Sequence, residues 1–179
     1  LLIGVVAGTE RGVSAMLIYM FVYTFMQLGA FAIVVLLRRR DVIGDELKDL
    51  SGLHARSPFA AFAMLLFMLS LGGIPPTAGF MGKFWLFSAA IDAQYYWLAV
   101  IGVLNSAVSL YYYIRIVVFM YLKKETMGSE PVLGPSLAVA LGVAVVATIV
   151  LGIYPRLLFE LAEASARTMG AAGIPTALR

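Results

Sequence analysis

The sequence predicts an all-α protein, a polytopic bundle of transmembrane helices with one discontinuous helix. Hydrophobic residues make up 62% of the 179 residues and charged residues only 13%, and the mean hydropathy is +0.95. Soluble domains carry about 25% charged residues. Glycines and prolines interrupt one apolar stretch at Gly72, Gly73, Pro75 and Pro76. Because such residues end helices, this stretch predicts a helix broken at membrane depth.

The first half of the chain contains one complete crossing. We expect residues 1–8 to be the end of a truncated helix, since a crossing needs about 20 apolar residues. After a turn over residues 9–12, residues 13–37 predict a transmembrane helix that ends at a run of three arginines. Apolar positions recur among charged ones over residues 41–57, which predicts an amphipathic interfacial loop.

Residues 58–91 predict a helix, a break and a second helix. Pro58 stands at a tolerated first-turn position, and each piece of about 15 residues is about 22 Å long, shorter than the roughly 30 Å hydrocarbon core. Either two short helices meet at a turn inside the membrane, or one crossing helix is discontinuous. Residues 97–122 and 136–154 predict further crossings, the second an anchor with almost no polar side chain beyond Thr148. Residues 155–179 form a C-terminal tail.

Lys83 is the main candidate for chemistry. It follows the break, which we extend to Gly79, and lies in an apolar stretch where a lysine costs several kcal/mol. The 10 acidic residues all fall in predicted loops or at predicted helix ends, so no carboxylate of this chain shares the membrane interior with Lys83. A titratable amine beside a broken helix indicates ion or proton movement. The alternative is a lysine that reaches the interface because its helix is short or displaced.

Polar side chains recur at helical spacing on two of the predicted crossings. The first set is Tyr19, Tyr23 and Gln27, with Thr24 beside them, and the second is Asn105, Ser109 and Tyr112, flanked by Ser106 and Tyr113. Such stripes can hold a chain of waters beside Lys83 and so form a proton path. The alternative is ordinary hydrogen bonding between helices, worth about 0.6 kcal/mol per contact.

Composition also limits the function classes. Because the chain has no cysteine and one histidine, His54, thiolate iron–sulfur ligation is excluded and a haem or zinc site is disfavoured. We therefore expect no cofactor in this chain. The net charge of +3 comes from loop lysines and arginines, which indicates membrane topology and not nucleic-acid binding.

The basic residues predict an orientation. One side collects Arg38, Arg39, Arg40, Lys48, Arg56, Arg156, Arg167 and Arg179, and the other collects Arg11, Lys123 and Lys124. The positive-inside rule places the first group in the cytoplasm.

Three stretches resemble a known family. Residues 69–84 (LSLGGIPPTAGFMGKF) resemble the motif of antiporter-like membrane subunits of respiratory complex I and of multisubunit cation/proton antiporters. Residues 111–115 (YYYIR) resemble a run in the N subunit of NADH:quinone oxidoreductase, and residues 49–53 (DLSGL) also fit. Gln27 stands roughly where the sister L and M subunits carry a lysine, which favours the N subunit. The resemblance covers essentially the whole chain, as the C-terminal part of an approximately fourteen-helix subunit.

The resemblance implies an antiporter-like complex I fold and a subunit that translocates protons without a redox centre. Lys83 matches the family's lysine on the discontinuous helix, towards the proton exit. NADH, FMN, iron–sulfur clusters and quinone are expected in partner subunits, and the neighbours would be M-, K- and J-type subunits. The location would be a bacterial inner membrane, or a thylakoid or equivalent membrane.

Two other functions stay open. One is an Mrp-type secondary cation/proton antiporter subunit, although sodium prefers oxygen ligands and no intramembrane carboxylate is visible. The other is a structural scaffold subunit in which Lys83 only holds helices together.

Overall fold

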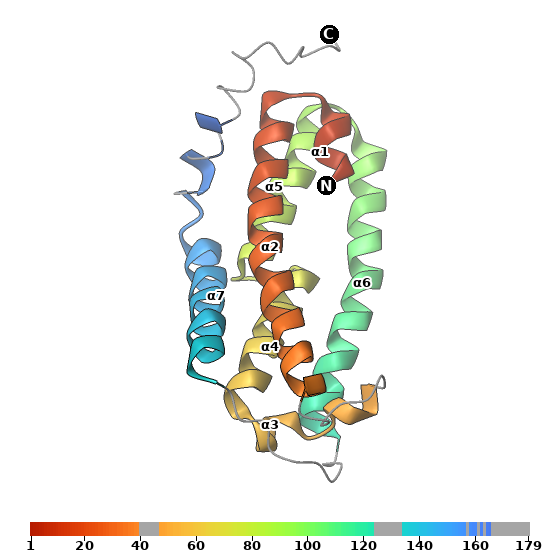
Figure 1. Cartoon of the computed structure of the whole chain (residues 1–179). Helices are drawn as coiled ribbons and strands as arrows, with labels where there is room; N and C mark the ends of the chain where they lie inside the picture. The colour runs from red at the N-terminus through yellow and green to blue at the C-terminus, as the bar shows by residue number, and fades with distance from the viewer. Residues whose placement is uncertain (40–46, 124–133, 157, 161, 163, 166–179) are drawn as a thin grey trace.

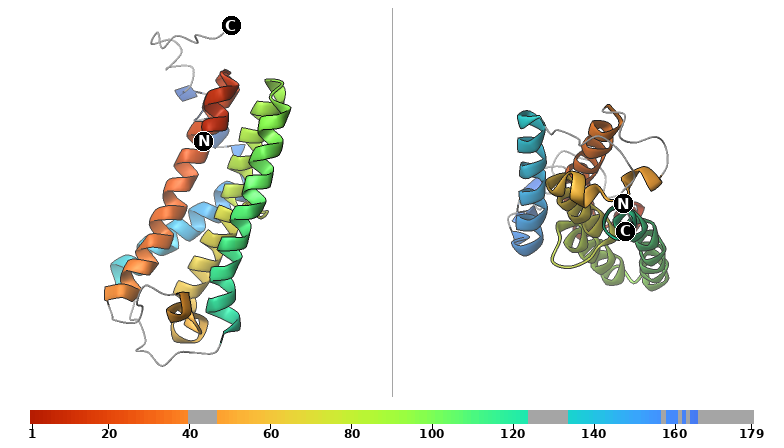
Figure 2. Two further views of the ribbon diagram at one scale, coloured as in Figure 1. Left: turned by 90° about the vertical axis from the view of Figure 1, so that its right-hand side faces the viewer. Right: turned by 90° about the horizontal axis from the view of Figure 1, so that it is seen from below.

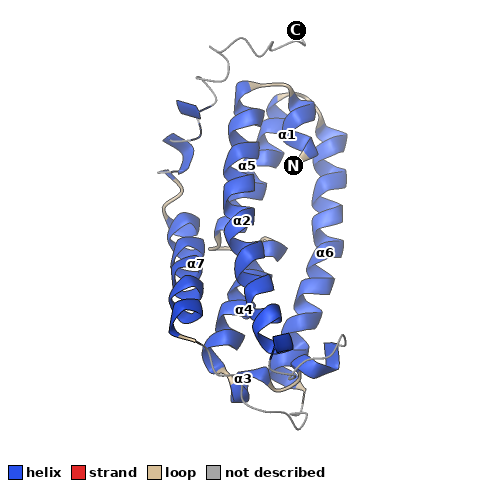
Figure 3. Ribbon diagram, in the orientation of Figure 1, coloured by secondary structure: helices blue, strands red, loops and turns tan. Residues whose placement is uncertain are grey.

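The protein is a bundle of helices, seen here in a computed structural model (Figure 1). The structure describes residues 1–39, 47–123, 134–156, 158–160, 162, 164 and 165. Helices and short connections account for all of this described part, without a strand (Figure 3). Three helices are long and apolar enough to cross a membrane: Glu10–Leu37, Tyr96–Leu122 and Pro135–Ile153. The predicted all-α transmembrane class is confirmed.

Helix α1 (Leu2–Ala7) turns sharply into α2 (Glu10–Arg39). Gly8 has a φ of 63°, the left-handed conformation that favours glycine. We predicted that α2 would begin at residue 13, but it begins at Glu10. The reason is a cap: the Thr9 hydroxyl accepts a 3.0 Å hydrogen bond from the Gly12 amide, which satisfies a free N–H group of the first turn.

Two short helices close the other end of the bundle. They are the 3-10 helix η1 (Leu47–Leu50) and α3 (Leu53–Arg56). A 2.9 Å hydrogen bond joins His54 Nδ1 to the Met120 carbonyl oxygen near the end of α6. Residues 41–46 of the predicted interfacial loop lie outside the described residues.

Helices α4 (Pro58–Gly72) and α5 (Ala78–Asp92) form one discontinuous crossing. Helix α4 starts beside α3, and α5 ends at the opposite end of the bundle (Figures 1 and 2). There Asp92 pairs with Arg11 at 2.9 Å. Of the two arrangements left open by the helix lengths, the structure has the discontinuous helix.

Helix α6 (Tyr96–Leu122) returns the chain to the end that carries α3. The predicted grouping of basic residues is therefore wrong for Lys123, which lies at the end of Arg56 and not with Arg11. It is also wrong for Arg156, because α7 (Pro135–Ile153) then runs away from that end (Figure 1). Arg40, Lys124, Arg167 and Arg179 lie outside the described residues.

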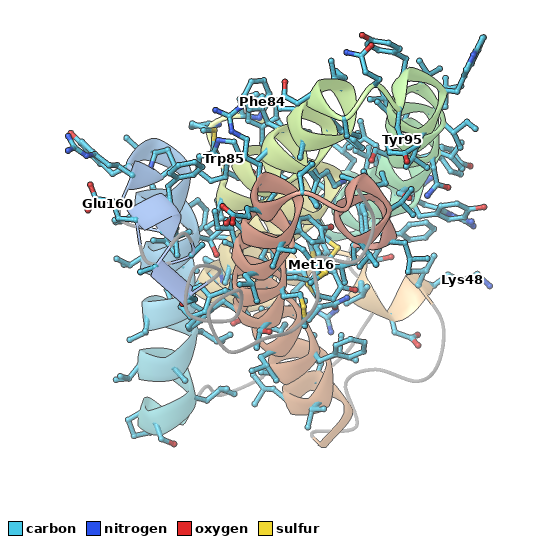
Figure 4. All side chains as sticks on the ribbon, turned by 90° about the horizontal axis from the view of Figure 1, so that it is seen from above. Met16, Lys48, Phe84, Trp85, Tyr95 and Glu160 are labelled. Carbon is cyan, nitrogen blue, oxygen red and sulfur yellow. The ribbon has the colours of Figure 1, made fainter. Side chains whose placement is uncertain are left out.

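The core lies between α2, α4 and α7. Its largest fully buried side chains include Ile33, Met26 and Phe67. Beyond α7, the Phe159 ring lies 5.5 Å from the Trp85 ring of α5, and Figure 4 shows Trp85 on the side towards the segment that bears Glu160. Helix α6 contributes little to this core, since only 6% of its most apolar stretch is buried. Most of its surface is free to meet lipid or other protein.

Candidate functional site at the helix break

Helix α4 ends in a left-handed glycine cap. Gly73 has a φ of 82°, and its amide donates to the carbonyl oxygens of Leu69 and Ser70. The Ile74 amide also donates to the Leu69 carbonyl, at 3.0 Å. The last four carbonyls of any helix lack partners within the helix. This cap satisfies two of them and leaves those of Leu71 and Gly72.

Lys83 satisfies the remaining two. Its amine donates to the Leu71 carbonyl oxygen at 2.8 Å and to the Gly72 carbonyl oxygen at 3.2 Å. A cation at the C-terminal end of a helix is also favoured by the partial negative charge there. The half-buried side chain thus folds back across the break instead of extending along α5.

A side chain of α4 in turn binds the first turn of α5. The Ser70 hydroxyl, in the last turn of α4, accepts a 3.0 Å hydrogen bond from the Gly79 amide. Thr77 closes the loop, because its hydroxyl donates to the Ile74 carbonyl at 2.7 Å. The sequence predicts Gly79 as part of the break. It does not single out Ser70, whose only signal is a serine in the last turn of an apolar helix.

Helix α7 packs its backbone against the break. A Cβ added at Gly152 would collide with the Pro76 carbonyl oxygen and come within 2.7 Å of the Ala78 nitrogen. We predicted only an anchor for this helix, so the contact was not foreseen. Glycines are frequent in membrane helices, and one near the end of an apolar helix gives no signal of a particular contact.

The polar stripe of α2 starts beside α5 at Tyr19 and lies near Tyr113 of α6. Tyr19 and Tyr23 stack with ring centroids 5.8 Å apart, and the Gln27 side-chain amide donates to the Tyr23 hydroxyl. Tyr113 of α6 lies near both tyrosines. The stripe reaches the neighbourhood of Lys83, since a Cβ added at Gly82 would lie 2.9 Å from the Tyr19 ring.

The other predicted polar residues do not join that stripe. Thr24 is exposed, and its hydroxyl donates to the Met20 carbonyl of its own helix at 2.9 Å. On α6, Asn105 and Tyr112 are exposed, and the Ser109 hydroxyl donates to the Asn105 carbonyl. Tyr113, predicted only as a flanking residue, takes the place expected for Tyr112.

No carboxylate lies within ion-pair distance of Lys83 among the residues that the structure describes. Two ion pairs found elsewhere, Arg11–Asp92 and Arg156–Glu160, are largely exposed. The described residues also contain no group of three or more His, Cys, Asp or Glu side chains that could hold a metal ion. The groups bound to the Lys83 amine are therefore backbone carbonyl dipoles.

The helical membrane bundle with its broken crossing helix has the fold of antiporter-like membrane subunits. Residues 1–109 match the family described as "NADH:quinone oxidoreductase/Mrp antiporter, TM", and the chain belongs to this family.

Two proteins of similar sequence are N subunits of NADH-quinone oxidoreductase. The chain is 46% identical over 167 residues to NADH-quinone oxidoreductase subunit N 2 of Solibacter usitatus, covering 92% of the chain and 34% of the relative. It is 46% identical over 164 residues to subunit N of Trichlorobacter lovleyi, covering 90% and 34%. The chain thus spans about a third of the length of these relatives. The predicted resemblance to the N subunit is confirmed.

Solved structures agree on the fold. A chain of respiratory complex I from Thermus thermophilus superposes with a TM-score of 0.74 at 30% identity, over 86% of this chain and 35% of that one. A chain of the Mrp complex from Dietzia sp. superposes with a TM-score of 0.81 at 23% identity, over 92% of this chain and 39% of that one. The second likeness shows the fold alone.

Proposed function

We propose that this chain carries a proton-transfer step in the N subunit of a proton-pumping NAD(P)H:quinone oxidoreductase, with Lys83 as the group that takes up and releases the proton. One observation carries the proposal: the Lys83 amine lies in the helix break, bound to the Leu71 and Gly72 carbonyls at 2.8 and 3.2 Å.

The carbonyl pair allows the amine to change its protonation state in place. A protonated amine has three N–H donors, of which two are used by the carbonyls, so one is free for water or a passing partner. A neutral amine keeps two donors and gains a lone pair, so the hydrogen bonds to the Leu71 and Gly72 carbonyls both persist. Because no fixed carboxylate among the described residues holds the proton, a change in nearby charge can drive its release.

The stripe of Tyr19, Tyr23 and Gln27 with Tyr113 is the proposed approach to Lys83. Hydroxyl and amide groups can pass a proton through intervening waters, and these four side chains lie near one another, with Tyr19 beside Gly82 of α5. Asn105, Ser109, Tyr112 and Thr24 would serve only a second path along the exposed faces of α6 and α2. They stay predictions.

The electron-transfer chemistry is assigned to other subunits. We expect NADH, FMN, iron–sulfur clusters and quinone to bind there, and M-, K- and J-type subunits to be the membrane neighbours. The setting is a bacterial inner membrane or an equivalent energy-transducing membrane. Quinone reduction would alter the charge near Lys83 through these neighbours.

The test is proton pumping by the complex that carries Lys83→Met, in sealed inverted vesicles, with assembly and electron transfer to an artificial acceptor recorded alongside. Lys123→Met is the matched control, because Lys123 is exposed at the end of α6. Loss of a positioned proton carrier costs about 100-fold or more in rate. We expect assembly to persist while pumping and coupled quinone turnover collapse in Lys83→Met only. Wild-type pumping by assembled Lys83→Met would instead favour a scaffold role.

A further inference from the structure

We propose that Ser70 is a positioning residue for Lys83: its hydroxyl clamps the first turn of α5 onto the last turn of α4 and so fixes where the Lys83 amine meets the Leu71 and Gly72 carbonyls. This inference rests on the proposed proton-transfer role of Lys83.

Ser70 lies where no solvent can replace its hydrogen bond. Its exposed fraction is 0%, and its hydroxyl is bound to the Gly79 amide across the break at 3.0 Å. That amide belongs to the first turn of α5, whose N–H groups have no partner within the helix. A side chain of α4 therefore caps α5.

Lys83 makes the reciprocal contact. Its side chain belongs to α5 and caps the last carbonyls of α4. Gly79 and Lys83 are one turn apart and share a face of α5, because residues four apart in a helix are neighbours. Two hydrogen-bonding contacts in opposite directions thus join the same two helix ends, and each fixes the spacing on which the other depends.

The two helix ends are in direct contact at the clamp. A Cβ added at Gly79 would collide with the Ser70 carbonyl oxygen and lie 2.9 Å from its hydroxyl oxygen. This face of α5 therefore lies directly on the backbone of α4. Because Gly79 has no side chain, it cannot itself hold the two helix ends at this distance. The Ser70 hydroxyl is the polar group placed to hold it.

The experiment compares Ser70→Ala with a matched loss of a buried hydroxyl, Thr148→Val. Thr148 is 2% exposed, but its hydroxyl donates only to the Ala144 carbonyl of its own helix. Proton pumping per electron is measured as a function of pH in sealed inverted vesicles of the whole complex. A neutral hydrogen bond changes an equilibrium by about fivefold, so Ser70→Ala should displace the pH profile of pumping by at least about half a pH unit. Thr148→Val should leave the profile unchanged.

Each outcome decides the matter. A displaced profile in Ser70→Ala with an unchanged one in Thr148→Val supports the inference, and a wild-type profile in assembled Ser70→Ala overturns it. If Ser70→Ala fails to assemble, Ser70→Cys decides, since its thiol is a weak acceptor of similar size: a displaced profile supports the inference and a wild-type profile overturns it. Lys83→Met in the same series separates the two proposals, because only its wild-type pumping would remove the proposed function itself.

Discussion

The Lys83 amine lies 2.8 Å from the Leu71 carbonyl oxygen, although the two residues are 12 positions apart and on opposite sides of a helix break. An interrupted helix inside a membrane must find partners for its free backbone groups. Here the side chain that could carry a proton is also one of those partners. Structure and proposed chemistry therefore depend on the same contact.

Gly79→Ala tests how closely the two halves of the crossing must approach. The added methyl group would collide with the Ser70 carbonyl oxygen, so we expect a loss of about 1–3 kcal/mol in stability, as for other overpacked sites. Thermal unfolding of the purified complex measures it. Gly142→Ala is the control, because a Cβ there meets nothing within 4 Å. Equal stability of the two variants would contradict the tight approach.

Gly152→Ala tests the contact of α7 with the break. Its methyl group would meet the Pro76 carbonyl oxygen, and we expect it to push α7 away and to lower pumping without touching Lys83. The measurement is the proton-to-electron ratio of assembled complex, again beside Gly142→Ala. A ratio equal to that of wild type would show that the break tolerates movement of α7.

Tyr23→Phe tests the polar stripe of α2. The change removes the hydroxyl that accepts from the partly buried Gln27 amide, and the loss of one such hydrogen bond costs about 0.5–1.5 kcal/mol. If the stripe leads protons to Lys83, the pumping rate should fall at least about threefold, converted from the typical worth of one hydrogen bond. Thr24→Val is the control, since Thr24 is exposed and bonded within its own helix. Equal pumping rates in both variants would show that the stripe is not part of the proton path to Lys83.

Asp92→Asn tests whether the Arg11–Asp92 pair has more than a minor role. The two side chains are 76% and 51% exposed, and exposed ion pairs contribute about 0.2–1 kcal/mol. We expect a small loss of stability that disappears at high salt and no change in pumping. A collapse of pumping in this variant would mean that charge at this end of α5 matters to transport.

Sequence alone could predict the elements whose signals are local. The helix break followed from its glycines and prolines. Lys83 was singled out by its apolar surroundings, and its role stays a prediction. The start of α2 was missed because the Thr9 cap was not recognised within a polar turn. The single crossing made by α4 and α5 could not be derived from helix lengths, since two short helices fit either arrangement. The wrong side predicted for Lys123 followed from that ambiguity.

Features that depend on packing between helices could not be predicted from the sequence. Tyr113 lies near the α2 stripe and Tyr112 is exposed, a difference that depends on how α6 is rotated against its neighbours. The contacts of Ser70 and Gly152 arise only when distant segments meet. Neither has a local pattern that would separate it from an ordinary residue of an apolar helix.

Chemical rescue of Lys83→Cys tests the central claim most directly. The chain has no cysteine of its own, so 2-aminoethyl methanethiosulfonate would attach an amine to this chain only at position 83, at nearly the length of the lysine side chain. Wild-type complex treated in the same way controls for reaction elsewhere in the complex. Methyl methanethiosulfonate, which adds no amine, controls for size. We predict that Lys83→Cys assembles without pumping and that only the aminoethyl reagent restores pumping. Full pumping by untreated Lys83→Cys would contradict the account.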